Sequence, residues 1–186
     1  MKSKSPQPIN AYLRIALRFA LLFSLAAGRL SAGRPPAPTA GETRLNRLFL
    51  EVLDGDTIRY RGVVMRFLGV DTPEIRNPQH GFYTDQPYGR KAANFTRAEI
   101  KKARVVTCRA DGRDVYDRLL VHLFVDGYPL SLLIVESGMG YETVSAFGDN
   151  GFPQIAGRIL EASRRVGDLP FEAPYLWRRK NRLGPQ

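Results

Sequence analysis

The stretch LFLEVLDGDTIRYRGVVMRFLGVDTPE, residues 48–74, decides how this chain folds. It contains three strand-like runs, 48–53, 57–61 and 63–70, and Gly55 and Gly62 lie at the breaks between them. Glycine adopts the positive φ angles of tight turns at little steric cost, and apolar runs bounded by such residues are typical of strands. The pattern therefore predicts an antiparallel meander of three strands.

The rest of the globular part adds strands and helices to this meander. Apolar runs predict further strands over 104–109 and 119–125. Helical spacing predicts helices over 87–103 and 153–166, and a short apolar helix over 130–136 ends near Gly138. Five strands, with helices after the third and the fifth, fit a twisted five-stranded barrel with a helix packed across it.

The charge balance favours an anionic partner. The chain has 28 Lys and Arg against 18 Asp and Glu, a formal net charge of +10. A basic surface attracts polyanions because neutralised phosphates release counterions, although positive charge also aids solubility and membrane adhesion. The single cysteine, Cys108, excludes an intrachain disulfide, and its strand-like surroundings predict a small buried side chain.

The N-terminal 43 residues are predicted to lie outside the folded domain. Lys2, Lys4, Arg14 and Arg18 precede an uncharged run over 19–28, which is shorter than the roughly 20 residues of a membrane span. This order predicts a signal peptide over 1–32, with a retained membrane anchor as the alternative. We therefore expect a secreted or periplasmic protein. Residues 33–43 form a Pro-rich linker, and the folded domain covers 44–186.

Two acidic clusters follow strands of the meander. Asp54 and Asp56 form the first cluster, and Asp71 and Glu74 form the second. An up-and-back hairpin would bring both clusters to one end, where hard cations such as Ca²⁺ take carboxylate and backbone carbonyl oxygens. Zinc is disfavoured because no histidine or cysteine cluster accompanies them. Taken singly, each aspartate can also be a turn or cap residue bonded to nearby amides.

Pro73 stiffens the turn between Asp71 and Glu74. A turn of this kind can offer the Thr72 carbonyl to a cation and direct Glu74 past it. A carboxylate just beyond a metal is well placed to orient or deprotonate a water molecule. The alternative for Glu74 is a solvated surface side chain.

Two arginines are candidate phosphate ligands. Arg66 interrupts an apolar strand, where an inward guanidinium is costly unless it is paired. It can pair with the carboxylates or bind a phosphate, for which its planar fork is suited. Arg118 precedes the strand at 119–125, and its alternative is an ordinary pair with neighbouring Asp117.

Taken together in this order, the motifs resemble the staphylococcal nuclease (thermonuclease) family over about residues 47–178. That resemblance implies an α+β fold, a five-stranded OB-fold-like β-barrel with about three helices. It also implies calcium-dependent hydrolysis of DNA and RNA that leaves 3′-phosphate ends. The motifs that carry it are Asp54-Gly55-Asp56-Thr57, residues 66–70, Asp71-Thr72-Pro73-Glu74, Pro87-Tyr88-Gly89-Arg90-Lys91-Ala92 and Tyr116-Asp117-Arg118.

The resemblance also implies a role for each matched residue. Asp56 and Asp71 would bind Ca²⁺ through carboxylates and Thr72 through its carbonyl, with Asp54 supporting them. Glu74 would be the general base for the attacking water. The remaining matched residues are Arg66 and Arg118, which would bind the phosphate, and Tyr116, which would line the nucleotide site.

One departure from the family pattern bears on activity. Asp117 replaces the family's usual glycine and could draw Arg118 away from phosphate. The resemblance implies a monomer that acts on DNA and RNA, with single strands preferred. The alternative functions are a catalytically weak OB-fold module that binds nucleic acid, and a surface adhesin attached through the N-terminal segment.

Overall fold

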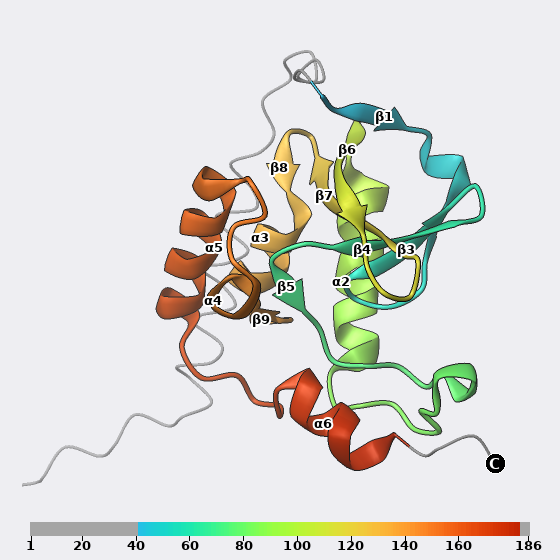
Figure 1. Ribbon diagram of the computed structural model, residues 1–186, viewed down its shortest axis with the longest axis vertical. Helices are drawn as coiled ribbons and strands as arrows, with labels where there is room; N and C mark the ends of the chain where they lie inside the picture. The colour runs from blue at the N-terminus through green and yellow to red at the C-terminus, as the bar shows by residue number, and fades with distance from the viewer. Residues whose placement is uncertain (1–40, 183–186) are drawn as a thin grey trace, which may run out of the picture. The chain divides into compact units, whose positions relative to one another are not determined.

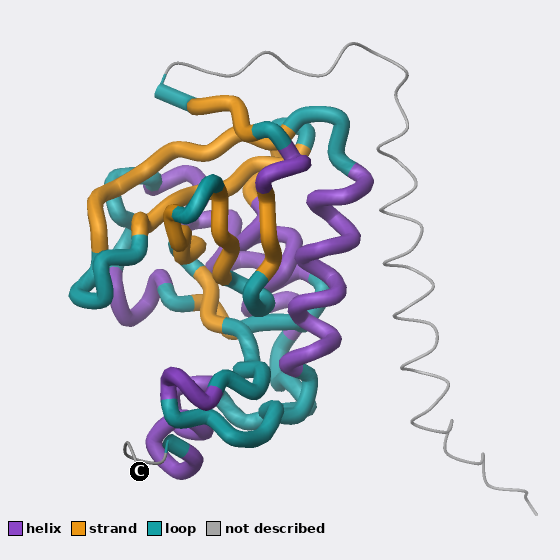
Figure 2. The backbone as a smooth tube through the Cα atoms, turned by 90° about the vertical axis from the view of Figure 1, so that its right-hand side faces the viewer, coloured by secondary structure: helices purple, strands orange, loops and turns teal. Residues whose placement is uncertain are grey.

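The structure, a computed structural model, describes residues 41–182. The expected signal peptide (1–32) and most of the linker (33–43) lie outside these residues. Among the described residues, no helix is long and apolar enough to cross a membrane. Figures 1 and 2 show strands that curl together and helices packed beside them.

The predicted meander is present and forms one part of a larger sheet. Strands β2 (Leu50–Val52), β3 (Thr57–Tyr60) and β4 (Val63–Phe67) pair antiparallel in sequence order. The last predicted strand is broken, because residues 68 and 69 turn the chain into β5 (Val70–Asp71). Gly69 has φ +80, a left-handed conformation that favours glycine. The turn separates Asp71 from the main sheet.

The main sheet is mixed rather than wholly antiparallel. Its order is β1-β6-β7-β4-β3-β2, and β4 pairs with β7 in parallel. The short β5 pairs with β9 in a second sheet. The remaining strands are β1 (Thr43–Leu45), β6 (Val106–Arg113), β7 (Leu119–Val125), β8 (Tyr128–Pro129) and β9 (Tyr141–Glu142).

The helices agree with the three predicted segments and add two more. Helix α5 has the predicted bounds, and α3 covers the predicted apolar segment. The added helices are α4 and α6. The bounds are α2 Gly89–Lys102, α3 Leu130–Glu136, α4 Val144–Phe147, α5 Pro153–Val166 and α6 Pro174–Asn181, with 3₁₀ turns η1 Arg47–Phe49 and η2 Pro78–His80.

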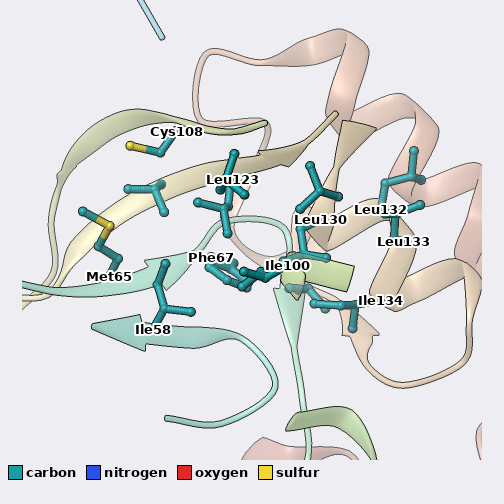
Figure 3. Close-up of a cluster of buried hydrophobic side chains, with 14 of the residues drawn as sticks. Ile58, Met65, Phe67, Ile100, Cys108, Leu123, Leu130, Leu132, Leu133 and Ile134 are labelled. Carbon is teal, nitrogen blue, oxygen red and sulfur yellow. The ribbon is translucent and has the colours of Figure 1, made fainter. Parts of the chain in front are cut away.

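The core lies between the curled sheet and helices α2, α3 and α5. Ile58, Phe67 and Leu123 project from the strands towards Leu130 and Ile134 of α3, as Figure 3 shows. Cys108 is a free buried thiol on β6, as predicted. The predicted fold class, an OB-fold-like α+β fold, is confirmed, although the main sheet has more strands than five because it also contains the short strands β1 and β8. This core fixes the β3–β4 hairpin whose end carries the acidic residues.

Candidate active site

Asp56 is almost fully buried, with 1% of its surface exposed. The β3–β4 register pairs Thr57 with Arg66, and the Phe67 amide donates to the Asp56 carbonyl at 2.8 Å. The Asp56 carboxylate accepts hydrogen bonds from the Thr72 amide at 2.6 Å and the Thr72 hydroxyl at 2.9 Å. These bonds bring the two acidic segments together, as the predicted hairpin requires.

Arg66 bridges the two aspartates expected to bind a cation. Its Nη1 pairs with Asp56 Oδ1, and its Nη2 donates to Asp71 Oδ1 at 2.7 Å. Burial acts to raise the pKa of Asp71, but the guanidinium groups of Arg66 and Arg178 outweigh it, so the pKa is lowered. The Asp71 carboxylate therefore stays ionised well into acidic pH.

The C-terminal helix contributes an arginine that sequence reasoning missed. Arg178 of α6 donates to Asp71 Oδ1 at 3.0 Å, to Asp71 Oδ2 at 2.8 Å and to Glu74 Oε1 at 2.7 Å. Figure 1 shows α6, in red, at the end of the domain where the loop after β5 runs. The basic tail after Trp177 was the only sequence signal, because contacts across 104 residues are not encoded locally.

Glu74 is held by its backbone. The Glu74 amide donates to the side-chain oxygen of buried Gln86 at 3.1 Å, and the Gln86 amide donates to the Glu74 carbonyl at 2.9 Å. A Cβ on Gly89 would lie 2.1 Å from that carbonyl, so only glycine permits this approach. Burial and the nearby charge of Asp54 raise the pKa of Glu74 against the influence of Arg178 and Arg66. A raised pKa suits a group that must accept a proton.

The first acidic turn is packed tightly against its neighbours. A Cβ on Gly55 would lie 2.5 Å from the Thr72 hydroxyl and 2.8 Å from Ala92 of α2. The Thr96 hydroxyl donates to the Gly55 carbonyl at 2.5 Å. Asp54 accepts a bond from the Asp56 amide at 3.0 Å, and burial raises the pKa of Asp54. Helix α2 therefore supports the turn that presents Asp56.

Arg118 approaches from the loop between β6 and β7. It comes directly before β7, whose Leu120 pairs with Arg66 of β4. Burial raises the pKa of Asp54, and the charge of Arg118 offsets part of that rise. Arg118 is therefore linked electrostatically to the acidic cluster. Arg66 therefore contacts the carboxylates directly, whereas Arg118 makes no hydrogen bond or ion pair with Asp56, Asp71 or Glu74.

Asp114 holds Arg118, and Asp117 does not. The Arg118 Nε donates to Asp114 Oδ2 at 2.7 Å, and its amide donates to Asp114 Oδ1 at 3.0 Å. Asp117 pairs instead with Arg113 at 3.1 Å and has φ +62, a conformation that favours glycine. Tyr116 is exposed, with the Arg118 guanidinium 5.5 Å from its ring centroid. The alternative of a pair between Arg118 and neighbouring Asp117 is wrong, because Asp114 is the partner of Arg118. The effect of Asp117 on activity stays a prediction.

The donor chemistry of this cluster fits a hard cation. Asp56, Asp71 and Glu74 supply carboxylate oxygens, which hard cations prefer as ligands. The positively charged guanidinium of Arg178 already donates hydrogen bonds to Asp71 and Glu74. Within residues 41–182, no three His, Cys, Asp or Glu side chains converge as a metal-binding group. The arrangement accounts for this, because Arg66 and Arg178 stand between the carboxylates. Calcium binding by Asp56, Asp71 and Thr72 stays a prediction.

Comparison with known proteins agrees with the order of these motifs. The family described as "Staphylococcal nuclease homologue" matches residues 64–151. Over these residues, the chain is similar to the staphylococcal nuclease family. The part that matches the staphylococcal nuclease family contains Arg66, Asp71, Glu74 and Arg118, whereas Asp56 and Arg178 lie outside it.

Several curated proteins that are similar to this chain carry nuclease names. Endonuclease YncB of Bacillus subtilis is 34% identical over 93 residues, 47% of this chain and 43% of the relative. The SPbeta prophage-derived endonuclease YokF of the same species is 34% identical over 93 residues, 47% of this chain and 30% of the relative. Thermonuclease of Staphylococcus intermedius is 31% identical over 97 residues, 50% of this chain and 56% of the relative. The chain thus spans less than two thirds of each of these relatives.

Proposed function

We propose that this protein is a metal-dependent nuclease that hydrolyses phosphodiester bonds in DNA and RNA. The observation that carries the proposal is the grouping of Asp56, Asp71 and Glu74 with Arg66 at one end of the β3–β4 hairpin. Relatives named as endonucleases and a thermonuclease support it. The net charge of +10 would raise the rate of encounter with nucleic acid.

The proposed cation is Ca²⁺, held by the Asp56 and Asp71 carboxylates and the Thr72 carbonyl. Bound there, it would polarise a phosphate oxygen as a Lewis acid. Arg66 and Arg118 donate to the non-bridging phosphate oxygens and stabilise the charge that develops on them. Tyr116, exposed beside Arg118, contacts the nucleotide.

Glu74 acts as the general base in this mechanism. It accepts a proton from the attacking water, whose oxygen forms a new bond to phosphorus. The bond from phosphorus to the 5′ oxygen breaks, and the leaving oxygen takes up a proton. The products are a 3′-phosphate and a 5′-hydroxyl.

The test is hydrolysis of single-stranded DNA and of RNA, each with Ca²⁺ and with a chelator, followed by end-group analysis. We expect hydrolysis only with Ca²⁺ and products that end in 3′-phosphate. Equal rates with and without chelator would contradict the metal dependence. Absence of hydrolysis in both conditions would contradict the nuclease proposal. Sedimentation analysis of the same preparation tests the expected monomer.

One observation favours a second candidate, a binding module without catalysis. The carboxylates that a nuclease would offer to a cation are neutralised by Arg66 and Arg178 in this structure. A module of this kind would hold single strands in a basic groove. It would bind labelled oligonucleotides with strong salt dependence and leave them intact in the presence of Ca²⁺.

Export, by a signal peptide over 1–32, is part of the nuclease proposal and is tested by intact-mass measurement of the mature protein.

A further inference from the structure

Arg178 occupies the oxygens that a divalent cation would need. Its two terminal nitrogens contact both oxygens of Asp71 and one oxygen of Glu74, at 2.7–3.0 Å. Asp71 Oδ1 also accepts a bond from Arg66. Because a carboxylate has few lone pairs, a cation that approaches Asp71 and Glu74 from the open side competes directly with Arg178.

The aromatic residues around α6 set the position of Arg178. Trp177 is buried against Phe82, with ring centroids 5.7 Å apart. Phe171, three residues before α6, packs against Tyr88 at 5.1 Å and Tyr141 at 5.6 Å. These contacts hold the start of α6 against the site. The aromatic packing therefore places Arg178 within reach of Asp71.

Gln86 joins the same segment to the backbone of Glu74. Its side-chain oxygen accepts from the Glu74 amide, and its Nε2 donates to the Glu172 carbonyl at 2.7 Å. Gln86 is 1% exposed, so this link is rigid. The segment before α6 and the candidate base are therefore positioned by one buried side chain.

Of the two arginines on Asp71, Arg178 is the one able to leave. The Arg66 side chain is 17% exposed and lies on a strand inside the sheet, whereas the Arg178 side chain is 31% exposed and lies on a short helix. Arg178 also retains solvent access, which lowers the cost of moving its charge into water.

We infer that Arg178 is a built-in competitor of the divalent cation, closing the site until a cation displaces it from Asp71 and Glu74. The inference rests on the proposed function, because that proposal supplies the cation. Calcium binds only the molecules in which Arg178 has left the site, so the apparent Kd equals the intrinsic Kd divided by the open fraction. A closed form that is favoured about tenfold therefore raises the apparent Kd about tenfold. The helix α6 thereby sets the calcium concentration at which the site fills.

The test is calcium binding by calorimetry, without substrate, in four proteins: wild type, Arg178→Gln, Arg178→Lys and Arg179→Gln. Arg179 is exposed on the same helix, so Arg179→Gln removes an equal charge without touching Asp71. We expect Arg178→Gln to bind Ca²⁺ about tenfold more tightly than wild type. Arg178→Lys should lie between the two, and Arg179→Gln should match wild type. Trp177 is the only tryptophan of the chain, so its emission checks that α6 is still docked.

Equal or weaker calcium affinity in Arg178→Gln would overturn the inference, and Arg178→Lys provides the same comparison if the glutamine variant does not fold. An increase of the same size in Arg179→Gln would also overturn it, because the effect would then be general electrostatics. If wild type cleaves DNA with Ca²⁺ but Arg178→Gln has unchanged affinity, the inference fails and the nuclease proposal stands. If affinity rises as expected but no variant cleaves nucleic acid, the competition stands and the nuclease proposal fails.

Discussion

The two arginines predicted to bind phosphate lie in opposite kinds of environment. Arg66 lies on strand β4, is 17% exposed as a side chain and bridges buried Asp56 and Asp71. Arg118 lies at the end of a largely exposed loop, is 33% exposed and, among the acidic side chains of residues 41–182, is held by Asp114 alone. Residues 115–117, between Asp114 and Arg118, are all exposed, whereas Asp56 and Thr72 are buried. Arg66 and its aspartates therefore form a fixed half of the site, and Arg118 with Asp114 forms an adjustable half.

This contrast has a physical reason. A buried carboxylate without a partner is costly, so Arg66 must stay in place for the domain to fold around Asp56. An exposed ion pair contributes little, so Arg118 can exchange Asp114 for a phosphate at small cost. One arginine is therefore part of the fold, and the other is free to respond to a ligand.

Replacing Arg66 should produce the largest effect. Arg66→Met leaves Asp56 and part of Asp71 buried without a counter-charge, and we expect a loss of about 3 kcal/mol in unfolding free energy. Arg118→Met should lose less than about 1 kcal/mol, because its pair is partly solvated. Urea denaturation of both variants measures the difference. Equal losses would remove the distinction between a fixed and an adjustable half.

Replacing Glu74 should separate activity from stability. Glu74→Gln is expected to lower turnover by about 10² to 10⁴, the usual contribution of a general base. Because the pKa of Glu74 is raised, its ionised carboxylate destabilises the folded state near neutral pH. The urea midpoint of Glu74→Gln should therefore not fall below that of wild type. Glu161→Gln, an exposed position on α5, is the matched control. An unchanged turnover in Glu74→Gln would exclude it as the base.

The pKa values of the carboxyl groups should be shifted in opposite directions from their ordinary values. Nuclear magnetic resonance of labelled side chains can follow each titration. Asp71 and Asp114 are expected below the ordinary value of 3.8 and Glu74 above 4.5. Asp71 stabilises the fold above pH 3.8, and this contribution is lost as the pH falls through its lowered pKa. Glu74 has the opposite sign, since its contribution is lost as the pH rises through its raised pKa. An Asp71 that titrates above 3.8 would argue against its pairing with Arg66 and Arg178.

Replacing Asp117 should have the smallest effect. Asp117→Gly relieves a left-handed residue at φ +62 and removes only an exposed pair with Arg113. The expected gain is about 0.5–1 kcal/mol, the steric relief less the extra entropy of glycine. Turnover should change by less than about twofold, because an exposed pair carries little energy and Arg118 is held by Asp114. A large rise in turnover would show that Asp117 restrains Arg118 after all.

Local patterns predicted much of the fold because they act over a few residues. The strands of the meander, the helix over 153–166 and the strand over 119–125 follow from periodicity and glycine breaks. The break between β4 and β5 was missed, since one glycine in an apolar run can also be tolerated inside a strand. Helix α6 was missed because only eight residues form it and aromatic packing stabilises it.

The sequence by itself determined which chemical groups are available: carboxylates at two strand ends, an arginine between them and a second arginine before a later strand. These features are local, since each depends on a turn or on alternation along one strand. Only the tertiary structure decided that Arg178 lies on Asp71 and Glu74, that Asp114 holds Arg118 and that Gln86 fixes Glu74. The bonds of Arg178 and Gln86 join segments far apart in the chain, and even the Arg118 pair depends on how its loop folds, so packing and electrostatics of the whole domain select the partners.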